Sequence, residues 1–212
     1  MRLDEALEQI SDIRRQMVKR QVFRGYRALT VGFSGVLGVG AAAVQQRWAG
    51  APEVGAGLFL DRYLVLWAGV AATSLLAAAL EIVWRVGRDG LAKRHAMLAV
   101  ERFGPSVVVG GLLMVCIYRG EPAAAWMLPG LWAMIFGLGI FASNELLPRK
   151  AVAVGMYYIL CGCASLLWGH GERAFSPWLM GTTFGGGQLL AAVIVYLHVE
   201  RHDGAAEGQR RG

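Results

Sequence analysis

Apolar residues along the chain gather into long uncharged stretches, and charged residues fall in short islands between them. A membrane-spanning helix needs about 20 predominantly apolar residues, with a working range of roughly 17–25. Six stretches reach or approach this length: Ala28–Val44, Tyr63–Trp84, Pro105–Tyr118, Ala123–Leu147, Ala151–Trp168 and Trp178–Leu197. The pattern predicts an all-α, polytopic integral membrane protein with six transmembrane helices in three hairpins.

The third stretch, Pro105–Tyr118, is shorter than a full span. Pro105 fits the first turn of a helix, because its missing N–H would have no helical partner there. Alternatively, the helix begins near Leu98 and kinks at Pro105, so that Glu101 and Arg102 lie at the membrane interface. The pattern leaves both alternatives open.

A polar segment with a different periodicity precedes the first span. Over residues 1–27, apolar residues recur at three- and four-residue spacing, which predicts a cytoplasmic amphipathic helix outside the bilayer. Its acidic residues come first and its basic residues last, an order that complements the helix dipole. The expected organisation is therefore this helix, a transmembrane domain over residues 28–197, and a polar, disordered cytoplasmic tail over residues 198–212.

The distribution of Lys and Arg predicts the orientation. If the N-terminus is cytoplasmic, 17 of the 21 Lys and Arg residues fall on the cytoplasmic side and 4 fall outside. Cytoplasmic loops of membrane proteins carry such an excess. We therefore expect a multi-pass protein of the inner cell membrane with both termini in the cytoplasm.

Composition agrees with this class. Hydrophobic residues make up 56% of the chain and charged residues 17%, against about a quarter charged in soluble domains. The net charge of +6 would be compatible with nucleic acid binding. However, the basic residues follow the membrane edges rather than one face of a domain, so we expect the lipid bilayer as partner and no nucleic acid.

Small residues recur at helical spacing in the first and sixth stretches. Gly181 and Gly185 form a GxxxG pair, and Ser34 with Gly38 forms a related small-xxx-small pair. Such residues let helix backbones approach closely in lipid, so we expect these four to pack helices together. The alternative is a flexible, gate-like helix at residues 185–187.

A few polar residues lie within the apolar stretches. Gln188, close to Thr182 and Thr183, is the most deeply placed large polar side chain. It must face other helices or a wet cavity, either as an interhelical hydrogen bond or as a small polar ligand site. Glu81 and Glu145 each stand four residues before an arginine that can neutralise them, although acids in spans also serve proton or cation coupling.

The sequence contains no P-loop, no zinc-binding HExxH motif and no paired carboxylates deep in the spans. We therefore expect no catalytic residues, no metal and no cofactor, and a non-enzymatic regulatory or scaffold protein. Its working surface would be residues 1–27, docking to the membrane face, to a second copy, or to a cytoplasmic protein. The alternative is a small transporter or channel-like carrier with a ligand site around Gln188, Thr182, Thr183, Glu81 and Glu145.

The even number of spans generates a topology prediction. Reporter tags inserted at Lys93 and after Gly212 should both appear on the same side of the membrane as Met1, because each is separated from it by an even number of crossings. Protease protection of the tags in intact vesicles measures this. A tag at either site that reports from the opposite side would exclude the predicted count of spans.

Overall fold

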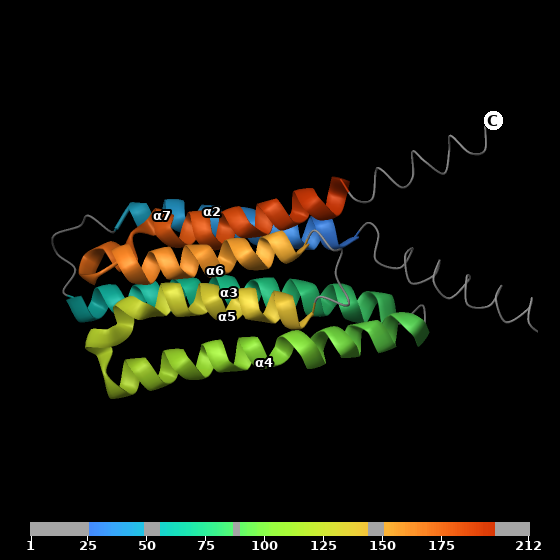
Figure 1. Cartoon of the computed structure of the whole chain (residues 1–212), viewed down its shortest axis with the longest axis horizontal. Helices are drawn as coiled ribbons and strands as arrows, with labels where there is room; N and C mark the ends of the chain where they lie inside the picture. The colour runs from blue at the N-terminus through green and yellow to red at the C-terminus, as the bar shows by residue number, and fades with distance from the viewer. Residues whose placement is uncertain (1–25, 49–55, 87–89, 144–150, 198–212) are drawn as a thin grey trace, which may run out of the picture.

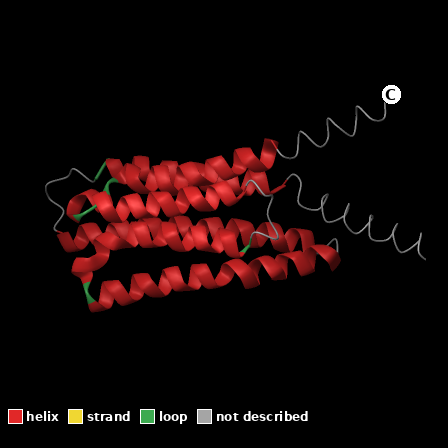
Figure 2. Cartoon of the chain, in the orientation of Figure 1, coloured by secondary structure: helices red, strands yellow, loops and turns green. Residues whose placement is uncertain are grey.

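A computed structural model describes residues 26–48, 56–86, 90–143 and 151–197. In these ranges the chain is helical with short connections and contains no strand (Figure 2). The tail 198–212, Glu145 and all but the last two residues of the predicted amphipathic helix lie outside the described residues.

The helices follow one another with short connections between them. In chain order they are α2 (Tyr26–Gln46), α3 (Ala56–Val86), α4 (Gly90–Gly120), the 3-10 helix η1 (Pro122–Met127), α5 (Leu128–Ala142), α6 (Ala151–Trp168), the 3-10 helix η3 (Gly171–Phe175), α7 (Pro177–Met180), the π-helix η4 (Gly181–Gly186) and an α-helical stretch over residues 187–197.

Among the described residues, five helical stretches are long and apolar enough to cross a membrane. They are Ala28–Gln46, Gly57–Val83, Val100–Gly120, Pro122–Ala142 and Pro177–Leu197. A shorter apolar helix covers Val152–Trp168. The predicted all-helical class is confirmed, and the helices have the composition of a membrane protein.

Two helices extend beyond their predicted limits. α3 begins at Ala56 rather than at Tyr63, and α4 runs from Gly90 to Gly120 with Pro105 inside it. The first-turn position considered for Pro105 is therefore wrong, and the alternative of an upstream start falls short because the helix begins before Leu98. Charged residues end the apolar stretches without ending the helices, since Arg, Lys and Glu are good helix formers.

Pro129 lies near the N-terminal end of the fourth apolar stretch, at the start of α5. The fourth apolar stretch starts as the 3-10 helix η1 and continues as α5, and Pro129 lies in the first turn of α5. At that position the missing proline N–H removes no helical hydrogen bond. The change of helix type thus falls where proline is tolerated.

The helices form a ring in which each packs against its neighbours in sequence (Figure 1). α2 contacts α3, α3 contacts α4, α4 contacts α5 and α5 contacts α6; α6 then contacts η4, and both α7 and η4 return to α2. In Figure 1, α4 lies along one edge of the bundle, on the far side from α2 and α7.

Two clusters of buried side chains fill the ring. One is centred on Tyr63 and Trp67 of α3 and Leu128 of α5, with Ala41, Ala42, Leu64, Val70, Ala125 and Met180 around them. The other joins Tyr158 and Val154 of α6 to Ala133 and Ile140 of α5. Large aromatic side chains therefore pack on the inside of the ring.

Glycines bring α5 and α6 together at two levels. A Cβ atom on Gly162 would meet the carbonyl oxygen of Gly130 at 2.7 Å, and a Cβ on Gly137 would meet that of Gly155 at 2.8 Å. The two glycines of α5, and likewise the two of α6, are seven residues apart, so each helix uses the same face at both contacts. The two antiparallel helices are in backbone contact along this face.

The small residues singled out in the sequence lie between α2 and the last span. A Cβ on Gly38 would stand 3.1 Å from the Cα of Gly185, and one on Gly181 would stand 2.6 Å from the Cβ of Ala42. Ser34 is buried, and its hydroxyl donates to the carbonyl of Thr30 at 3.1 Å. These positions allow α2 and the last span to approach closely.

Gly137→Ala should destabilise the bundle, because the new methyl would also stand 2.9 Å from the Cγ1 of Ile159. Overpacking of this kind costs about 1–3 kcal/mol. Unfolding by heat or SDS in mild detergent measures the change. Gly111→Ala is the matched control, since a Cβ there meets nothing within 4 Å and alanine favours the helix. Equal stability of both variants would contradict the close packing of α5 on α6.

Candidate functional site at the π-helix

The last span changes helix type in its first half. Pro177 opens α7, which after one turn becomes the π-helix η4 over Gly181–Gly186, and the α-helix resumes over residues 187–197. A π-helix closes hydrogen bonds five residues apart instead of four, and such segments are frequent at functional sites. This irregular stretch is therefore the first place to look for a site.

Two consecutive tyrosines of α6 bind the backbone of the π-helix. The Tyr157 hydroxyl donates to the carbonyl oxygen of Thr182 at 2.7 Å, and the Tyr158 hydroxyl donates to that of Phe184 at 3.2 Å. In hydrocarbon no water satisfies a carbonyl left over by an altered helix, so side chains of neighbouring helices must do so. α6 thus supports the π-helix through its two hydroxyls.

Gln188 extends this network by one bond. Its side chain is 8% exposed, and its Nε2 donates to the Tyr158 hydroxyl at 3.2 Å. The hydroxyl therefore accepts from Gln188 and donates to Phe184, which uses both of its functions. The deepest large polar residue of the span faces another helix.

Each glycine of the run 185–187 makes room for a different neighbour. A Cβ on Gly185 would stand 3.0 Å from the backbone nitrogen of Val39, on α2. A Cβ on Gly186 would lie 3.2 Å from the Tyr157 hydroxyl, and one on Gly187 would lie 2.7 Å from that of Tyr158. The glycines allow helices on several sides to approach the π-helix.

The two threonines point in different directions. Thr183 is 5% exposed and lies inside the bundle, whereas Thr182 is exposed. The Thr182 hydroxyl donates to the carbonyl of Trp178 at 2.6 Å, one turn earlier in its own helix. Only Thr183 of this pair therefore lies inside the bundle, as Gln188 does.

Glu81 lies at a separate place, between α2 and α3. Its carboxylate accepts a hydrogen bond from the Thr30 hydroxyl of α2. The structure does not describe the side chain of Arg85, its expected partner, so that pairing stays a prediction. The candidate ligand residues accordingly fall into two groups, with Gln188 against α6 and Glu81 against α2.

A second set of side-chain hydrogen bonds joins helices at the end of the bundle where α2 ends. Gln45 is 0% exposed; its Nε2 donates to the carbonyl of Phe175 at 2.7 Å, and its Oε1 accepts from the Trp67 indole at 2.9 Å. The ring of Tyr63 packs edge-on against Phe175 with centroids 4.9 Å apart. One amide thus joins α2, α3 and η3.

The tyrosines and Gln45 are the residues that the sequence did not single out. Tyr157 and Tyr158 lie within an apolar stretch, where a tyrosine cannot be distinguished by pattern from a large apolar side chain. The sequence did contain one signal for them: a buried amide such as Gln188 needs a polar partner on a facing helix.

In the described part of the chain, no group of three His, Cys, Asp or Glu side chains is placed to hold a metal ion. The polar network contains an amide and hydroxyls that donate hydrogen bonds and carbonyls that accept them, and none of these groups carries a charge. No protein-family model, no curated protein and no solved structure matches the chain.

Tyr158→Phe should destabilise the bundle by about 1 kcal/mol, because the Gln188 amide and the Phe184 carbonyl both lose their partner. Combined with Gln188→Leu, it should show a coupling of about 0.6 kcal/mol, the average for such bonds in membranes. A double-mutant cycle on unfolding free energies in detergent measures this.

Gln46→Leu is the control for that cycle, since Gln46 is exposed and lies on α2. Its effect should add to that of Tyr158→Phe. If Gln188→Leu were equally additive, the bond would make no net contribution to stability.

Proposed function

We propose that this protein is a non-enzymatic, multi-pass component of the inner cell membrane that acts as a scaffold or regulator. In this proposal the chain crosses the bilayer six times, and both termini are cytoplasmic. Residues 1–27 form an amphipathic helix at the cytoplasmic surface that docks to a protein partner, to a second copy or to the membrane face.

The observation that carries the proposal is how the two buried amides, Gln45 and Gln188, are used. Gln188 is bonded to Tyr158, Tyr158 to a backbone carbonyl, and Gln45 to Trp67 and another carbonyl. A carrier needs polar groups that face its path and exchange partners with the substrate. Here these groups hold helices to one another, which favours a rigid membrane platform.

The dimensions and contacts of α6 support a sixth span. Its 18 residues fall within the working range for crossing the hydrocarbon, and it contacts α5 at two glycine levels seven residues apart. A helix that follows the span of α5 along its length would cross with it. With six crossings, the excess of Lys and Arg lies on the cytoplasmic side, as membrane proteins prefer.

The π-helix favours a second candidate function, a small transporter. It interrupts the α-helix of the last span with a different pattern of backbone hydrogen bonds, and its glycines would allow the segment to change shape. Under this alternative, breaking the bonds from Tyr157 and Tyr158 would open a polar path past Gln188 and Thr183.

Water accessibility of residue 188 separates the two functions. In a chain with Cys116, Cys161 and Cys163 replaced by alanine, Gln188→Cys should stay unlabelled by a water-soluble maleimide in intact membranes and react after denaturation. The scaffold proposal expects this because the side chain is buried. Arg173→Cys, at an exposed position of η3, is the control that should label without denaturation. Labelling of Gln188→Cys in native membranes would favour the transporter instead.

Deletion of residues 1–20 tests the proposed working surface. Cross-linking followed by purification should recover fewer copies or partners from the shortened chain, whereas Gln188→Leu should recover as many as the wild type. The opposite result would count against the scaffold. Melting curves of both variants verify that the bundle is intact.

A further inference from the structure

A lateral groove lies between α3 and α4, the neighbouring helices at one side of the ring. Its volume is about 390 Å³, within the usual range of ligand sites. Its walls are apolar and come from both helices: Leu64, Val65, Ala68, Met114 and Val115. Val65 is 73% exposed and Val115 is 50% exposed, so the groove opens to the surroundings of the bundle.

One end of the groove is polar. Asp61, Tyr118 and Arg119 line it there, and the Tyr118 hydroxyl donates to Oδ1 of Asp61 at 2.7 Å. Within the described ranges, Asp61 forms no ion pair with Arg119, although both line the same groove. A carboxylate has about four acceptor positions, so Asp61 can accept further hydrogen bonds while it keeps that of Tyr118. The groove thus carries a separate negative and positive group at one end.

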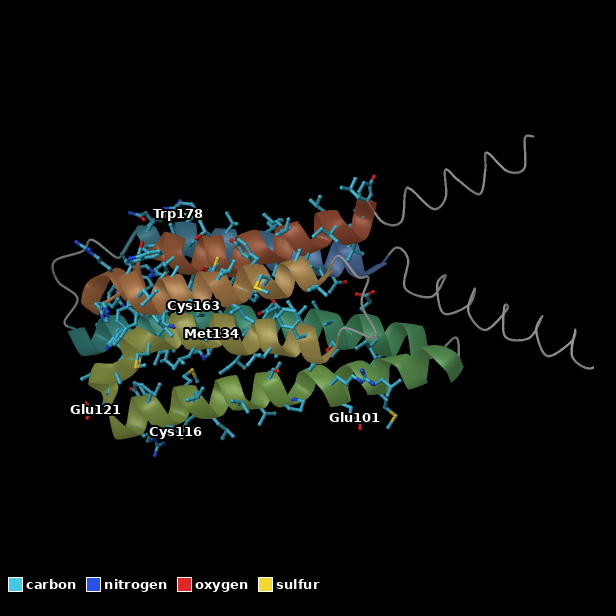
Figure 3. The ribbon with its side chains drawn as sticks, in the orientation of Figure 1. Glu101, Cys116, Glu121, Met134, Cys163 and Trp178 are labelled. Carbon is cyan, nitrogen blue, oxygen red and sulfur yellow. The ribbon has the colours of Figure 1, made fainter. Side chains whose placement is uncertain are left out.

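This polar end lies near the ends of two candidate membrane spans, Gly57–Val83 and Val100–Gly120. Arg119 stands in the last turn of α4, and Asp61 in the second turn of α3. Figure 3 shows Glu121, which follows α4, and Trp178, in the first turn of the last span, at this same end of the bundle. Tryptophan is enriched at membrane–water interfaces. An apolar groove below a charged end matches the direction of a lipid molecule in a leaflet.

We propose that the groove binds one phospholipid whose headgroup joins a phosphate to a primary ammonium, such as phosphatidylethanolamine. One acyl chain lies along the apolar walls. The phosphate is held by Arg119, whose planar guanidinium suits phosphate oxygens, and the ammonium donates to Asp61. The proposal requires that α3 and α4 lie in a bilayer, and it is independent of the scaffold role and of the six-span count.

Charge and hydrogen bonding together select this headgroup over others. Phosphatidylglycerol offers Arg119 a phosphate but offers Asp61 no cation. Phosphatidylcholine has a quaternary ammonium, which cannot donate a hydrogen bond to the carboxylate. A headgroup with a phosphate and a primary ammonium gives both residues an opposite charge and also gives the Asp61 carboxylate a charged hydrogen-bond donor.

Lipid retention tests the proposal. The purified full chain is incubated in mild detergent with an equimolar mixture of phosphatidylethanolamine, phosphatidylglycerol and phosphatidylcholine, and bound lipids are counted by native mass spectrometry. The wild type should retain one phosphatidylethanolamine in preference to the others. Arg119→Gln and Asp61→Asn should each lower that retention roughly two- to fivefold, the range of one exposed ion pair. Equal retention of all three lipids would overturn the proposal, because it would indicate an adventitious lipid only.

Two neighbouring substitutions separate the groove from the rest of the surface. Ala68→Phe fills the groove and should abolish retention, whereas Gly69→Phe points its ring into open space, where a Cβ meets nothing within 4 Å. Undiminished retention by Ala68→Phe would also overturn the proposal. If Ala68→Phe does not fold, as its melting curve would show, the two charge variants at the surface decide the outcome.

Discussion

Close approach of helix backbones at glycine is the constraint on which this bundle depends. Lipid tails are as apolar as leucine, so helices in a bilayer associate through close packing and hydrogen bonds rather than through the hydrophobic effect. α5 meets α6 at Gly130 and Gly137, and α2 meets the last span near Gly38. These contacts leave no room for side chains and bring polar groups of different helices within bonding distance.

The fold could be predicted from the sequence wherever the surrounding solvent, hydrocarbon or water, determines the pattern of apolar residues. Long apolar stretches predicted helices, and the described helices cover five of the six and the fourth as far as Ala142, because a chain in hydrocarbon must satisfy its own backbone. The ends were less predictable. α3 and α4 continue past Asp61, Arg62 and Arg102, since hydropathy reports where a helix meets water and not where its hydrogen bonds end. No pattern in this single sequence indicated the order of the helices around the ring.

The candidate site was predictable in part. Gln188 stood out because an amide deep in a span needs a partner, but its partner could not be identified, because Tyr158 looks like any large residue in an apolar stretch. The change to a π-helix over Gly181–Gly186 had no local signature either. It depends on hydroxyls from α6 reaching the backbone, which only the packed arrangement reveals.

The length of α4 has a mechanical consequence. Its 31 residues measure about 46 Å, whereas the hydrocarbon is about 30 Å thick. The apolar stretch starts at Val100, so roughly 15 Å of helix precedes it. α4 is therefore a single rod, and its part from Gly90 to Ala99 precedes the apolar stretch. Pro105 lies inside this rod and lacks the N–H for one backbone hydrogen bond, so the rod bends most easily there.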